Sequence, residues 1–212
     1  MSLTVTWASY KIMQSQLNLN YNLSMPIFEI NQNQKYNPNS GFYETNEITI
    51  EKVSGYGNNF HSNLISIIEF NLHDSLFNSK DIKYILYGYY ETTFVGNNFS
   101  ETHTGYKNNL KLLEFTRNMG EKLEDSLKFR YAFIKIINYL KIDYIDINNT
   151  KKTNYYNVDF NRTTLLDEDA EILFKEFGQM ETKAKYIQLF DWKDSEGDSV
   201  LRRVVDDFYS VK

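Results

Sequence analysis

Apolar residues recur at three- and four-residue spacings between residues 121 and 142, which is the period of one face of an α-helix. Charged side chains fall largely between them, as on the solvent-facing side of such a helix. The C-terminal half of the stretch is apolar over more than one face, which is typical of a helix buried on several sides. The sequence therefore predicts a central helix over residues 121–142, with an apolar face formed by Leu123, Leu127, Phe133 or Ile134, Ile137 and Leu140.

A shorter helix is predicted just before this one. Its apolar residues are Leu110, Leu112, Leu113 and Phe115, and Gly120 marks the break between the two helices. Two further helices are predicted, over residues 164–177 and 200–208. The first opens at Thr164 and ends at a glycine, and the second carries an amphipathic apolar pattern.

Most of the remaining chain carries strand signals. Residues 64–72 and 82–95 fit either a helix or a strand, but their β-branched and aromatic content and the neighbouring turns favour strands, with Gly88 as a bulge. Residues 97–105 are predicted to be a loop. The order of elements predicts an α+β fold, a mostly antiparallel sheet packed against the helical pair. Short strands are predicted over residues 27–30, 48–53, 144–147, 155–160 and 186–192.

The N-terminal region has a sequence pattern that predicts a different structure from the rest of the chain. We expect residues 1–46 to form an extended arm and loop, and residues 47–212 to form a single α+β domain. Residues 3–12 are predicted to be a strand or arm. Further along, four apolar residues alternate with asparagines, which is the pattern of a two-sided extended segment that can add to the edge of a sheet in a partner. These predicted partner-binding residues are Leu17, Leu19, Tyr21 and Leu23.

Composition excludes several chemistries. The 212 residues contain no cysteine, which removes disulfides, thiolate zinc sites and cysteine nucleophiles. The net charge is −5 and no basic cluster is present, so direct binding to nucleic acid is disfavoured. The N-terminus lacks the pattern of a secretory signal and no apolar run is long enough to span a membrane, so we expect synthesis in the cytoplasm. An excess of Asn, Ile, Lys and Tyr is typical of AT-rich genomes, including those of bacteriophages.

Candidate catalytic residues are few. The spacing of His61, His73 and His103 does not place two histidines on one helix face, and we expect no metal ion, cofactor or small-molecule substrate. An apolar strand that ends in Asp191 and Lys193 resembles the second half of the PD-(D/E)xK nuclease motif. The resemblance covers three residues and implies a metal-dependent nuclease, in which a second carboxylate helps to hold the metal. That carboxylate would come from Asp159, Asp167 or Asp169.

The absence of a recognisable catalytic cluster and the 16% aromatic content favour a non-enzymatic assembly component of a larger complex, such as a connector or tail-associated subunit of a phage virion. We expect its partners to be other protein subunits. One alternative is an acidic inhibitor that binds a nucleic-acid-handling enzyme. A further alternative is the metal-dependent nuclease.

Overall fold

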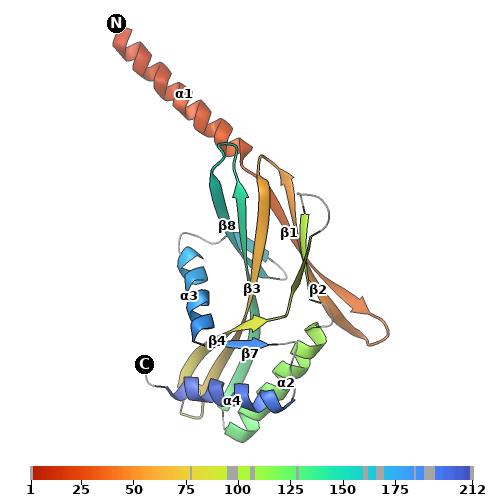
Figure 1. The fold of residues 1–212 in the computed structure, drawn as a ribbon. Coiled ribbons are helices and arrows are strands. Elements are labelled where there is room, and N and C mark those ends of the chain that lie inside the picture. The colour runs from red at the N-terminus through yellow and green to blue at the C-terminus, as the bar shows by residue number, and fades with distance from the viewer. Residues whose placement is uncertain are drawn as a thin grey trace.

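The structure is a computed structural model. It describes residues 2–76, 78–94, 100–105, 108–127, 129–159, 162–165, 170–183, 185–188 and 194–210. Within these residues the fold is α+β, with two sheets and four helices (Figure 1). The helices are α1 (Ser2–Ser24), α2 (Asn108–Leu127), α3 (Ala170–Thr182) and α4 (Asp194–Tyr209).

Both sheets are mostly antiparallel, and the one parallel pair among the described strands joins β10 to β4. The smaller sheet has the order β1-β2-β6-β5, formed by β1 (Ile27–Asn37), β2 (Phe42–Ser54), β6 (Ser100–Gly105) and β5 (Glu91–Phe94). The larger sheet has the order β10-β4-β3-β7-β8-β9. It is formed by β10 (Tyr186–Gln188), β4 (Ser79–Tyr87), β3 (Asn58–Asp74), β7 (Phe129–Ile145), β8 (Lys151–Asp159) and β9 (Arg162–Leu165).

α2 and α4 cover one face of the larger sheet, and α3 covers the other. Successive residues of a strand point to opposite faces, and β3 shows this clearly because Ile68 and Ile67 belong to different buried clusters. Ile68 lies in a cluster with residues of α2 and α4, whereas Ile67 lies in a cluster with Phe177 of α3. A third cluster joins Ile48 and Ile50 of the smaller sheet to β7 and β8. The core is thus built around β3 and β7, with helices on both sides of them.

The predicted central helix over residues 121–142 is wrong. Residues 108–127 form the single helix α2, which continues through Gly120, and residues 129–145 form the strand β7. β7 pairs with β3 in a register that runs from Asp74↔Phe129 to Asn58↔Ile145. Both faces of β7 carry apolar residues, although Tyr131 and Phe133 on one of them are 50% and 65% exposed, so its sequence imitates a helix buried on several sides. The sheet packs against a helical pair in the structure, but that pair is α2 and α4.

Several strand predictions are confirmed. Residues 64–72 lie within β3, residues 48–53 within β2, and residues 27–30 within β1. The hairpin after residue 144 is formed by β7 and β8, and its turn is held by Asp146, whose Oδ1 accepts hydrogen bonds from the backbone N–H groups of Asn148 (2.9 Å) and Thr150 (2.8 Å). Residues 200–208 lie within the helix α4, as predicted.

Other boundaries differ from the prediction. Residues 82–95 do not form one strand, because the chain turns at Gly88 (φ 72°) and passes from β4 in the larger sheet to β5 in the smaller one. Residues 100–105, predicted to be a loop, form β6. Residues 27–46, expected in the extended arm and loop, form β1 and the first part of β2. The helix predicted over residues 164–177 is α3, which begins at Ala170 and continues through Gly178. The strand predicted over residues 186–192 is described as β10 up to Gln188.

Candidate interaction surface

The predicted N-terminal strand is a helix in the structure. Residues 2–24 contain no glycine or proline and form α1, which ends just before Met25 and Pro26. Apolar residues at every second position fit this helix because two residues advance it by more than half a turn, which places them on nearly opposite sides. α1 therefore carries two apolar stripes. One contains Tyr10, Met13, Leu17 and Tyr21, and the other contains Ile12, Leu19 and Leu23.

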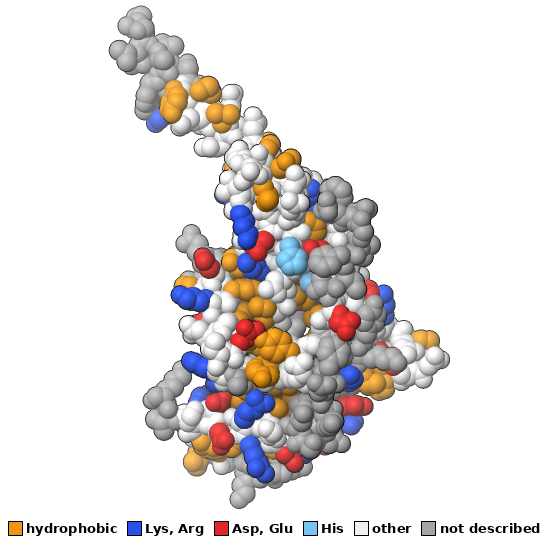
Figure 2. All heavy atoms as spheres, viewed as in Figure 1, with side chains coloured by type: hydrophobic (Ala, Val, Ile, Leu, Met, Phe, Trp, Pro, Cys, Tyr) orange, Lys and Arg blue, Asp and Glu red, His pale blue; other side chains and the backbone are white. Residues whose placement is uncertain are grey.

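Both stripes are exposed to solvent. α1 points away from the two sheets, with its N-terminal end farthest from them (Figure 1). Apolar side chains stand along the projecting part (Figure 2). Six of them are more than half exposed, with exposed fractions from 52% to 74%: Tyr10, Ile12, Met13, Leu17, Leu19 and Leu23. Lys11 is the one charged residue in the sequence of α1. A helix that is apolar on opposite sides is normally covered on both.

The C-terminal end of α1 is fixed to the body of the protein. The Tyr21 hydroxyl donates a hydrogen bond to Asp146 Oδ2 at 2.5 Å, and the backbone N–H of Tyr56 donates to Ser24 O at 2.6 Å. The hydrogen bond with Asp146 raises the pKa of Tyr21 to about 12, and the same bond lowers the pKa of Asp146. Of the four predicted partner-binding residues, three are thus exposed on the projecting helix, whereas Tyr21 anchors it.

Gly55 lies against the connection between α1 and β1. Its φ is +75°, and a Cβ at this position would lie 2.0 Å from Met25 O. Gly41 is a matched control, because its φ is +74° and a Cβ there would have nothing within 4 Å. We expect Gly41→Ala to lower the free energy of unfolding by about 1 kcal/mol, the cost of a left-handed alanine. Gly55→Ala should lower it by about 1–3 kcal/mol more, because the backbone must also move. Urea denaturation measures both, and equal losses would contradict this packing of the connection.

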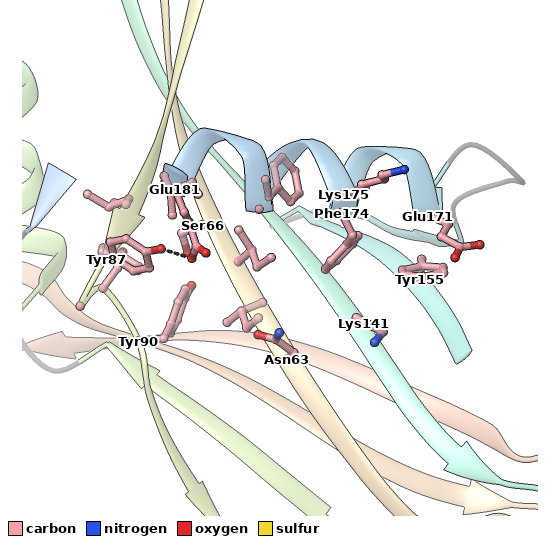
Figure 3. A pocket seen from close by; sticks show the side chains of 18 residues that line it. Asn63, Ser66, Tyr87, Tyr90, Lys141, Tyr155, Glu171, Phe174, Lys175 and Glu181 are labelled. Atoms are coloured by element: carbon pink, nitrogen blue, oxygen red, sulfur yellow. Dashed lines mark hydrogen bonds between the residues drawn. The ribbon is translucent and has the colours of Figure 1, made fainter. Parts of the chain in front are cut away.

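A second feature is a pocket of about 620 Å³ between α3 and the larger sheet (Figure 3). Its walls are aromatic, and Figure 3 shows Tyr90, Tyr155 and Phe174 around the space below α3. Several of its polar side chains already have partners within the protein. The Tyr87 hydroxyl donates a hydrogen bond to Glu181, and Lys141 Nζ lies 3.0 Å from Asp143 Oδ2. No motif in the sequence marks this pocket, since β3, β4, β7, β8 and α3 all contribute to it.

Two of the three histidines come together, which their spacing in the sequence does not predict. His103 Nε2 lies 2.7 Å from Ser62 Oγ, and Glu101 Oε2 accepts a hydrogen bond from the Ser62 backbone N–H at 2.7 Å. His61 Nδ1 lies 3.4 Å from Glu101 Oε1. In a catalytic triad the carboxylate holds the histidine and the serine faces a substrate. Here the carboxylate binds the serine, and Ser62 is only 2% exposed. We therefore interpret this cluster as a buried polar contact between β3 and β6.

This cluster makes stability depend on pH. Burial lowers the pKa of His103 to about 4, and repulsion from His61 acts in the same direction. An unfolded histidine titrates near pH 6.5. As the pH falls from about 6.5 towards 4, the unfolded chain therefore gains a proton that the folded chain does not, and the free energy of unfolding decreases by up to about 3 kcal/mol.

We expect His103→Gln to remove this part of the pH dependence. Urea denaturation near neutral pH and near pH 4 should show a loss for the wild type that exceeds the loss for the variant by about 3 kcal/mol. His73→Gln is the control, because it replaces an exposed histidine and should keep the wild-type pH dependence. A wild-type pH dependence in His103→Gln would contradict the assignment.

The residues of the nuclease-like pattern fall outside the part of the chain whose side chains the structure describes. Asp191, Lys193, Asp167 and Asp169 lie outside the described residues, and for Asp159 only the backbone in β8 is described. Among the described side chains, no group of three His, Asp or Glu residues is placed to hold a metal ion. None of the helices in the described part of the chain is long and apolar enough to cross a lipid bilayer.

No protein-family model matches the sequence, and no curated protein resembles it at a significant level.

Proposed function

We propose that the protein is a subunit of a larger protein assembly and that α1 is the element through which it joins a neighbouring subunit. The observation that carries this proposal is the uncovered apolar surface of α1, with six large apolar side chains more than half exposed. An isolated helix is only marginally stable in water, because most of the stability of a helix in a protein comes from packing of its apolar face. A partner that covers the stripes supplies this packing.

The energetics support such a contact. Complete burial of a large apolar side chain contributes about 1.5–3 kcal/mol. The loss of free motion on association costs about 4–15 kcal/mol. Because the six exposed side chains are already partly shielded, covering both stripes gains about 5–11 kcal/mol, which is of the same order as this cost. Lys11 is the one charge on the helix, so little charge needs to lose its water on docking.

The composition gives this proposal a more specific form, a connector or tail-associated subunit of a phage virion that is made in the cytoplasm and incorporated during assembly. In this role the protein acts by binding other subunits and not by catalysis. The bias towards Asn, Ile, Lys and Tyr supports a phage origin, and the aromatic content supplies side chains that are favoured at interfaces.

Sedimentation of the full chain tests the proposal. The chain is measured alone over a range of concentrations, and again after coexpression with the products of adjacent genes. We expect complexes larger than the 25.2 kDa of one chain, with a defined stoichiometry. A mass of 25.2 kDa under all these conditions would contradict the proposal. A monomer that binds one nucleic-acid-handling enzyme would instead support the alternative function, an acidic inhibitor of such an enzyme.

A further inference from the structure

The body of the protein carries an apolar groove that is separate from α1. The groove has a volume of about 430 Å³, within the range of pockets that enclose a ligand. One wall is the turn end of the β1–β2 hairpin, the other is the N-terminal half of α2, and the floor is β7. The two walls are joined by a hydrogen bond from Asn109 Nδ2 to Tyr43 O at 3.1 Å.

The groove is exposed and uncharged. Phe42, Tyr43 and Leu113 are each about half exposed, although they are large and apolar. None of the lining residues carries a charge, although the chain as a whole has a net charge of −5. A groove of this kind favours an apolar, uncharged occupant, because a charged group would lose its water there without gaining a partner.

We propose that the occupant is α1 of a second copy of this chain. This inference rests on the proposed function and names the partner of the same helix. α1 has the required chemistry, since it presents Tyr10, Met13 and Leu17 at helical spacing and contains the single charged residue Lys11. One contact between copies covers the groove and the stripe of Tyr10, Met13 and Leu17, two apolar surfaces that the isolated chain leaves open to water.

The geometry excludes the same copy. The bonds from Tyr21 to Asp146 and from Tyr56 to Ser24 fix the C-terminal end of α1 at the β7–β8 and β2–β3 turns. From there α1 points away from the body, whereas α2 lies at the other end of it (Figure 1). The helix and the groove are different surfaces, so copies join either reciprocally, as a two-fold dimer, or head to tail, as a ring or filament.

Cross-linking tests this contact, and the natural chain contains no cysteine to interfere. Leu17→Cys and Leu113→Cys are prepared as separate full-length variants with different tags, mixed, and treated with a short thiol–thiol cross-linker. The control pair is Leu17→Cys with Ile172→Cys, because Ile172 on α3 is exposed to a similar degree as Leu113. We expect at least about tenfold more cross-linked product from the first pair, since docking raises the local concentration of the two thiols.

A second measurement uses charge. Leu113→Asp should weaken self-association at least about tenfold, whereas Ile172→Asp should leave it unchanged, because only the first places a carboxylate in the groove. Equal cross-linking of the two pairs, in a chain whose assembly is still abolished by substitutions in α1, would overturn the groove assignment and leave the proposed function standing. A chain that is monomeric and binds no other subunit would overturn both.

Discussion

Leu123→Asp should leave the protein without a cooperative unfolding transition. Leu123 is on α2, is completely buried, and lies in the cluster that joins α2 and α4 to the larger sheet. A carboxylate at this position loses its water without gaining a partner, and the apolar contacts of leucine are lost as well. We expect a loss above about 5 kcal/mol, which approaches the whole stability of a typical domain of about 5–15 kcal/mol.

The matched control for this prediction is Leu113→Asp. Leu113 is on the same helix, but it is 53% exposed, so the same change should alter the free energy of unfolding by less than about 1 kcal/mol. Circular dichroism and urea denaturation of the two variants give the comparison. A cooperative transition at the wild-type midpoint in Leu123→Asp would mean that α2 does not form part of the core.

The second prediction concerns assembly. The double variant Leu17→Asp and Leu19→Asp places one carboxylate in each apolar stripe of α1, and we expect it to weaken association at least about 100-fold. The melting temperature of the dissociated chain should not change, because both side chains are 59% exposed. Sedimentation and thermal unfolding measure the two effects separately.

Asn18→Asp is the control for this variant. It introduces one carboxylate on the same helix, where the double variant introduces two, and it replaces an exposed polar side chain and not a leucine. Its effect on association should be less than about tenfold. If Asn18→Asp and the double variant weaken association equally, charge and not apolar contact governs the interface, and the role given to the stripes is wrong.

The sequence predicts the strands around β3 well, and physical reasons explain why. β-Branched and aromatic residues fill 64–72 and 48–53, and turn residues stand between them. These signals lie within short stretches of the sequence, so they predict the strands without knowledge of tertiary contacts. The α+β class follows from the same signals, because the strands are mostly joined by short connections.

β7 shows where local reasoning fails. Between residues 129 and 142 the apolar residues satisfy the spacing of a helix as well as that of a strand, since both faces of the strand carry apolar residues. The choice is made by pairing with β3, whose partner residues lie more than 50 positions earlier in the chain. No window of sequence contains that information. The prediction for α1 is wrong in the opposite sense, because an extended segment is predicted and a helix forms. Alternation of apolar and polar residues also arises from a helix with two apolar sides.

The candidate surface was partly predictable. The alternating pattern predicts that Leu17, Leu19 and Leu23 bind a partner as part of an extended segment, whereas the structure has them exposed on a helix. The apolar groove, the pocket below α3 and the contact of Ser62 with His103 have no local signature, because residues from several elements form each of them.

Amide hydrogen exchange of residues 10–24 tests the central claim most directly, namely that α1 is stabilised by a neighbouring subunit. In the chain held monomeric by dilution, these amides should exchange rapidly, because a projecting helix without tertiary packing opens easily. In the assembled form, the same amides should be strongly protected, while exchange in β3 and β7 should stay slow in both states. Strong protection of residues 10–24 in a verified monomer, or rapid exchange of these residues within the assembly, would contradict the account.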